Sequence, residues 1–159
     1  PAGCGSGCGP SFLLSWITVY ETASCGANFD GQQYRIWKDL TLDSSLQLKH
    51  APDGSALRRI HGHTYTLRLH LSAPLDQVMG WTIDFGDVKE IFNPIFKALD
   101  HQPLHEIPDL KDCDTASIAQ WILAKARAQL PQLDRVDLYE TRGCGAIVSA
   151  GAVGPALPV

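Results

Sequence analysis

Residues 61–71 read HGHTYTLRLHL, and this stretch predicts both a strand and a site on it. From Tyr65 to Leu71 apolar residues alternate with polar ones, which is the pattern of a strand with one buried face. His61 and His63 share the parity of Tyr65, so both imidazoles are expected on the core-facing side. Two neighbouring imidazoles suit a first-row metal, most often zinc, although strand histidines also serve as hydrogen-bonded structural groups.

A second strand is predicted just before this stretch. Residues 36–48 show the same alternation, and the turn residues Pro52-Asp53-Gly54 separate the two strands. Further along, residues 133–141 predict another strand, and residues 143–149 complete a hairpin with it.

Two helices are predicted between the two pairs of strands. Apolar residues recur at helical spacing between residues 84 and 99, and Pro94 is expected to kink that helix or to lie in its first turn. Asp114 or Thr115 is expected to cap a second helix that ends by Pro131. The order β-β-α-α-β-β indicates an α+β fold, with a four-stranded antiparallel sheet and two helices on one face.

An internal repeat indicates how the chain is organised. Residues 17–27 read ITVYETASCGA and residues 136–146 read VDLYETRGCGA, with six of eleven positions identical. We therefore expect residues 11–30 to be the terminal hairpin of a preceding copy and residues 31–150 to be one full copy. A flexible glycine-rich arm is expected over residues 1–10 and a tail over residues 151–159.

Composition limits the class of function. The 159 residues include 13 basic and 17 acidic side chains, so no basic footprint indicates nucleic-acid binding. No apolar run approaches the roughly 20 residues that a membrane helix needs. Five cysteines do not form a recognisable disulfide framework, so we expect the reducing cytoplasm.

Two further features could carry chemistry. In Asp100-His101, the acid can orient the histidine and tune its proton affinity, although a solvated helix end is an ordinary alternative. Glu140 is expected at the end of an apolar strand face, where a carboxylate can bind an amidine-like ring edge through two parallel hydrogen bonds. A strand-end acid in water is the alternative there, but the earlier copy keeps Glu21 at the equivalent position.

Together these residues resemble the 6-pyruvoyl- and 6-carboxytetrahydropterin synthases. The resemblance spans about residues 35–148, and its motifs are WKDLTL (37–42), HGHTY (61–65), GWTIDF (80–85), LDH (99–101) and YET (139–141). The Pro-Asp-Gly turn and the GWTIDF stretch are most similar to the bacterial carboxy type of the queuosine pathway.

The resemblance implies a tunnelling fold, in which units join edge to edge into a barrel, and oligomers with active sites between subunits. It implies a zinc-dependent lyase that converts 7,8-dihydroneopterin triphosphate with loss of triphosphate. His61 and His63 match two of the three zinc ligands, and Asp100 with His101 matches an assisting catalytic pair. Glu140 matches the glutamate that anchors the pterin. Thr115 lies in the segment that helps to bind the substrate.

Three positions depart from the family pattern. Leu46 stands where the family has its first zinc histidine, Leu57 where it has the proton-moving cysteine, and Ser117 where it has a glutamate. His50 is the candidate for a replacement third ligand, and Cys113 is the candidate for a replacement thiol.

The losses and the repeat suggest one hypothesis. The chain would be the degenerate second half of a tandem pterin synthase, in which a partner domain supplies the missing groups. The alternative is a catalytically inactive pterin-binding or structural subunit of a tunnelling-fold oligomer.

Overall fold

The computed structural model describes residues 17–29, 34–74 and 83–151. The expected arm (1–10), the hairpin positions 11–16 and 30, the Gly80-Trp81-Thr82 motif and the tail residues 152–159 lie outside the described residues.

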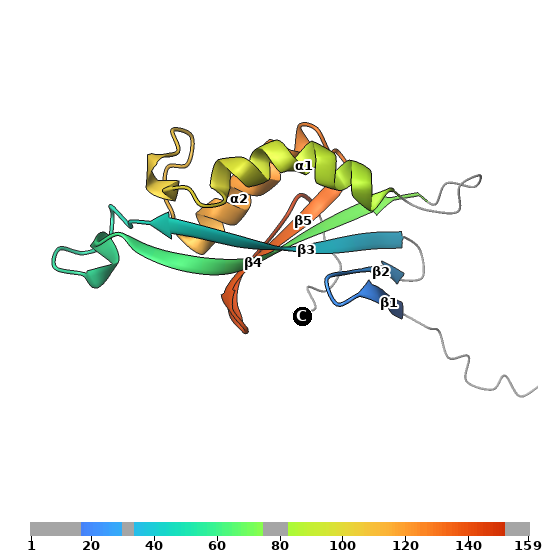
Figure 1. Ribbon diagram of the computed structural model, residues 1–159, viewed down its shortest axis with the longest axis horizontal. Coiled ribbons are helices and arrows are strands. Elements are labelled where there is room, and N and C mark those ends of the chain that lie inside the picture. The colour runs from blue at the N-terminus through green and yellow to red at the C-terminus, as the bar shows by residue number, and fades with distance from the viewer. Residues whose placement is uncertain (1–16, 30–33, 75–82, 152–159) are drawn as a thin grey trace, which may run out of the picture.

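The described residues form one antiparallel sheet whose six strands follow chain order, β1-β2-β3-β4-β5-β6 (Figure 1). The strands are β1 Ile17–Thr22, β2 Cys25–Phe29, β3 Tyr34–Leu46, β4 His61–Ala73, β5 Leu133–Thr141 and β6 Cys144–Ser149. The predicted α+β class and its antiparallel strands are confirmed. The sheet is wider than the four strands predicted, because the β1–β2 hairpin pairs with the outer edge of β3.

Two α-helices connect β4 to β5: α1 Phe85–Leu99 and α2 Thr115–Arg127. The Asp84 carboxylate accepts hydrogen bonds from the first amides of α1, and Asp114 does the same for α2. Asp114 is therefore the cap, and Thr115 is the first residue inside the helix. Pro94 lies inside α1 and beyond its first turn, so of the two alternatives that the sequence left for it, the first-turn position is wrong. Short 3₁₀ turns occupy Ala56–Arg58 and Leu104–Glu106.

The two helices cover one face of the sheet, as predicted (Figure 1). The hydrophobic core lies between them and that face. Every second side chain of each central strand points toward the helices and meets their apolar faces. Fully buried examples are Leu42, Leu67, Leu69 and Leu138 from strands, with Phe92, Ile118 and Ile122 from helices. This single core fixes which strand residues face the helices.

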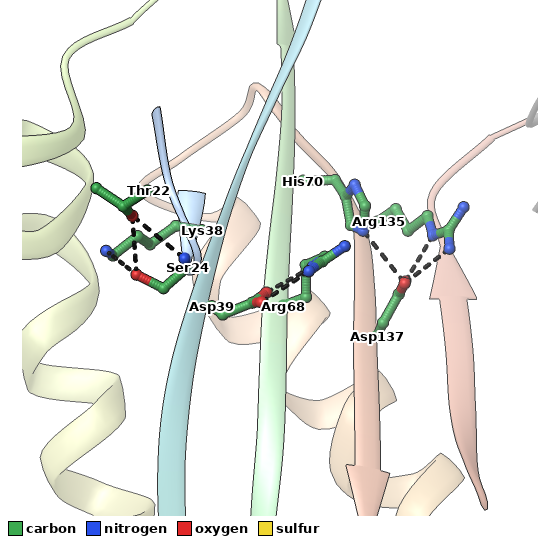
Figure 2. Close-up of polar contacts among 8 residues, drawn as sticks. All are labelled: Thr22, Ser24, Lys38, Asp39, Arg68, His70, Arg135 and Asp137. Atoms are coloured by element: carbon green, nitrogen blue, oxygen red, sulfur yellow. Dashed lines mark hydrogen bonds and ion pairs between the residues drawn. The ribbon is translucent and has the colours of Figure 1, made fainter. Parts of the chain in front are cut away.

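The opposite face of the sheet carries charged side chains that pair both across strands and along β5. Arg68 donates to both carboxylate oxygens of Asp39 at 2.5 and 2.7 Å, while Arg135 and His70 both bind Asp137, as Figure 2 shows. Arg68, His70, Arg135 and Asp137 are each less than a tenth exposed. Buried charges are tolerated here because each has an oppositely charged or hydrogen-bonding partner.

The helices of the described residues are all too short or too polar to span a membrane.

Candidate active site

The two histidines of the opening stretch lie together at the start of β4. Their ring centroids are 5.2 Å apart, and the His63 ring lies 5.4 Å from the Tyr65 ring. The strand period therefore places all three on one face, as the sequence predicts. The Nδ1 of His61 lies 2.7 Å from the carbonyl oxygen of Arg59, so it donates there and leaves Nε2 as the available lone pair.

Glu140 reaches this pair from β5. The β5–β6 register shifts between Tyr139 and Thr141, so Glu140 lies at a bulge. One carboxylate oxygen of Glu140 is 4.0 Å from Nδ1 of His63, and the other accepts a hydrogen bond from the Thr115 hydroxyl. Both His63 and Glu140 are about 30% exposed, at 29% and 31%, so the cluster opens to solvent. Four predicted site residues, His61, His63, Thr115 and Glu140, thus converge from β4, β5 and α2.

Tyr65 is a further candidate for this cluster that the sequence analysis did not single out. Burial, and then the negative charge of Glu140, raises the pKa of Tyr65 well above its ordinary value. Its hydroxyl therefore stays protonated and can donate a hydrogen bond. The signal was available in the shared parity of Tyr65 with His61 and His63, but that parity equally describes a core tyrosine.

Asp100 and His101 lie elsewhere, at the end of α1 and on the outer edge of β3. Oδ2 of Asp100 and Nδ1 of His101 are 2.8 Å apart, so the acid does orient the histidine. The backbone of Asp43 holds both residues: its amide donates to Asp100, and its carbonyl accepts from the His101 amide at 2.6 Å. The hydrogen bond and charge of Asp100 raise the pKa of His101.

β3 separates this pair from the Glu140 cluster. Ser44 and Leu46 pair with His63 and His61 across the inner edge of β3, whereas Asp43 binds the Asp100–His101 pair at the outer edge. Within one chain the candidate residues therefore form two separate groups, one on each side of β3.

The residues present do not fit a complete zinc site. Leu46 is the cross-strand partner of His61 and is buried, and a leucine side chain has no lone pair to offer. His50 lines a separate cavity of about 330 Å³ together with His105 and Cys113. Within the described ranges, no group of three His, Cys, Asp or Glu side chains is arranged to hold a metal ion.

Cys113 is buried, and burial raises the pKa of its thiol. The thiol is therefore protonated at neutral pH, unlike the thiolate that reactive cysteines use. Leu57 lies on the 3₁₀ turn Ala56–Arg58 and is half exposed. Ser117 binds the capping carboxylate of Asp114.

Comparison with known proteins gives concordant results. The family model "6-pyruvoyl tetrahydropterin synthase" matches residues 35–151. The dihydroneopterin monophosphate aldolase of Pyrococcus furiosus is 31% identical over 100 residues, which cover 61% of this chain and 84% of that protein.

Two solved structures share the fold. The 6-pyruvoyl tetrahydropterin synthase of Caenorhabditis elegans superposes with a TM-score of 0.66 at 16% identity, covering 74% of this chain and 95% of that one. A variant of the Plasmodium vivax 6-pyruvoyltetrahydropterin synthase superposes with a TM-score of 0.58 at 21% identity, covering 74% and 97%. On the family match and the aldolase identity, this chain belongs to the 6-pyruvoyl tetrahydropterin synthase family.

Proposed function

We propose that the chain binds the pterin ring of a dihydroneopterin phosphate at the Glu140 cluster. We also propose that it takes part in converting 7,8-dihydroneopterin triphosphate to a 6-carboxy- or 6-pyruvoyltetrahydropterin, with loss of triphosphate. The observation that carries the proposal is the convergence of His63, Thr115 and Glu140 from three separate elements.

The geometry of Glu140 suits a pterin edge. A pterin presents a ring N–H and an amino group side by side, and a carboxylate can accept from both at once. The Thr115 hydroxyl already donates to Glu140 and fixes the orientation of the carboxylate. Because Glu140 is 31% exposed at a bulge, a ring can approach it from solvent.

The role of this chain in the chemistry is to bind and orient the substrate. Among the residues that the structure describes, His61 and His63 find no third protein ligand, so we assign no step to zinc on this chain alone. The Asp100–His101 pair holds a proton at Nδ1 of His101, and it would act in a site shared with another unit. We accordingly propose a cytoplasmic oligomer or tandem protein in which this unit contributes an incomplete site.

A second activity is favoured by one observation, the 31% identity to a dihydroneopterin monophosphate aldolase. Its substrate shares the dihydroneopterin ring and a phosphate with the triphosphate proposed above. The same Glu140 anchor would therefore serve either reaction, and the product distinguishes them.

The test of the anchor is a fluorescence titration of the chain with 7,8-dihydroneopterin triphosphate. Glu140→Gln replaces one acceptor oxygen with a donor, so we expect binding at least about tenfold weaker, since charged hydrogen bonds contribute roughly 1.5–3 kcal/mol. Glu90→Gln, at an exposed position of α1, is the matched control and should bind as the native chain does. Equal binding by the E140Q variant would refute the anchor.

Chromatography of the reaction mixture then separates the activities. A 6-carboxy or 6-pyruvoyl product supports the synthase reaction, and a shortened side chain from dihydroneopterin monophosphate supports the aldolase. Binding without turnover supports the alternative of an inactive pterin-binding subunit.

A further inference from the structure

The β1–β2 hairpin repeats the β5–β6 hairpin in structure as well as in sequence. Val19 pairs with Ala27 as Leu138 pairs with Ala146, and every other printed pair of β1–β2 has its counterpart at the same offset of 119 residues. Both hairpins shift register after their tyrosine, so Glu21 lies at the same bulge as Glu140. The two hairpins are therefore the same structural unit used twice.

The two copies differ in what covers their apolar face. In β5, Val136 and Leu138 are fully buried, and α2 packs over β5 and β6. Their counterparts in β1, Ile17 and Val19, are 40% and 61% exposed. Exposed aliphatic side chains on a strand whose other copy lies beneath a helix indicate that, among the described residues, no helix fills over β1 the position that α2 holds over β5.

The free edge of β1 leaves room for a neighbouring strand as well as for a helix. β1 is an edge strand of the described sheet, whereas its counterpart β5 pairs with β4 along the corresponding edge. A helix placed over β1–β2 as α2 lies over β5–β6 would run beside α1. There an apolar cavity of about 350 Å³ opens, with Leu40 of β3 and Phe85, Phe92 and Phe96 of α1 in its lining.

We propose that β1–β2 is the last hairpin of a second unit of this fold that precedes Ile17 in the same polypeptide. That unit covers Ile17 and Val19 with its α2-like helix and pairs its β4-like strand with β1. A separate copy of this chain does not meet the requirement, because its α2 and β4 already pack against its own β5–β6 hairpin. The unit that covers β1–β2 must have no other terminal hairpin in that place. A unit whose chain continues directly into β1 meets this condition, because β1–β2 is then its terminal hairpin.

The arrangement also gives Glu21 a place in a shared site. The carbonyl of Ser24 accepts from the amide of Asp39 at 2.7 Å, which fixes the hairpin turn against the outer edge of β3. Asp100 and His101 lie farther along that same edge, at Asp43. The bulge carboxylate of the preceding unit and the acid–histidine pair of this one thus share one edge of β3.

The test places residues 34–135 of this chain ahead of Ile17, in place of residues 1–16, so that Arg135 joins Ile17 as it joins Val136 natively. The melting temperature is measured with and without the double substitution I17D/V19D, in this extended chain and in the 159-residue chain. We expect a shift of at most about 2 °C in the 159-residue chain, where both positions are exposed, and of at least about 8 °C in the extended chain. Leu138→Asp, buried in both chains, is the positive control.

Hydrogen exchange of the β1 amides is the second measurement. The extended chain should protect β1 from exchange to the degree that β5 is protected. Equal melting shifts in the two chains overturn the proposal, and this includes the case in which the added residues fail to fold onto β1. Concentration-dependent protection of β1 in the 159-residue chain also overturns it, because a separate copy would then cover the hairpin.

Discussion

Leu46 and His61 face each other across β3 and β4, and this one pair decides what the histidines can bind. A histidine at position 46 would add a third imidazole beside His61 and His63, because directly opposed strand residues have Cβ atoms about 4.5–5.5 Å apart. Three protein ligands and a water are the usual set of a catalytic zinc ion. The leucine instead extends the hydrophobic core to the end of β3.

Leu46→His is therefore expected to create a zinc site. After exposure to zinc and gel filtration, the variant should retain about one zinc ion per chain by mass spectrometry, and the native chain should retain far less. Leu46→Gln, which is polar but has no imidazole, is the control and should behave as the native chain does. Equal retention by the native chain would show that His61 and His63 already find a third ligand.

At the scale of elements, the cap of α2 sets the geometry of the site. Asp114 accepts hydrogen bonds from the amides of Ala116 and Ser117, which leaves the Thr115 hydroxyl to bind Glu140. The sequence left Asp114 and Thr115 as alternative caps. Only the orientation of α2 against β5 assigned one to the cap and the other to the site.

Asp114→Ala should lower the free energy of unfolding by about 1 kcal/mol, the usual cost of losing a carboxylate cap. Asp109→Ala removes the exposed ion pair with Lys125 and should cost less than about 0.5 kcal/mol. Urea denaturation measures both. Burial alone would raise the pKa of Asp114, but its hydrogen bonds to Ser117 and Ala116 lower it. The stabilisation by the cap is thus present above the pKa of Asp114 in the unfolded chain, and it is lost as pH falls through the pKa of the folded chain. Equal losses of stability in the D114A and D109A variants would contradict the capping role of Asp114.

At the scale of the whole molecule, the buried polar face of the sheet makes stability depend on pH. Burial lowers the pKa of His70 below its ordinary 6.5, despite the neighbouring Asp137. Hydrogen bonds from His70 and Arg135 lower the pKa of Asp137 against the opposing effect of burial. In both cases the unfolded chain takes up a proton at a higher pH than the folded chain, so folding weakens as pH falls.

We expect the melting temperature of the native chain to fall between pH 7 and pH 5, the range in which unfolded His70 becomes protonated. His70→Gln removes this titration and should flatten the profile in that range, measured by circular dichroism. An unchanged slope in the H70Q variant would exclude His70 as the cause.

His101 affects stability with the opposite sign. Because its pKa is raised in the folded chain, its contribution to stability is fully present below the ordinary pKa of 6.5 and is lost as pH rises through the pKa of the folded chain.

Periodicity determined much of this protein from sequence alone: the two strands predicted within residues 36–71, both helices, and the shared face of His61 and His63. These features depend on neighbours within a few residues, and such local patterns are legible in one sequence. The tertiary structure decided that Glu140 meets His63, that β3 separates this cluster from Asp100 and His101, and that β1–β2 joins the sheet. Those facts depend on bulges, strand register and packing between residues far apart in the chain, which no local period encodes.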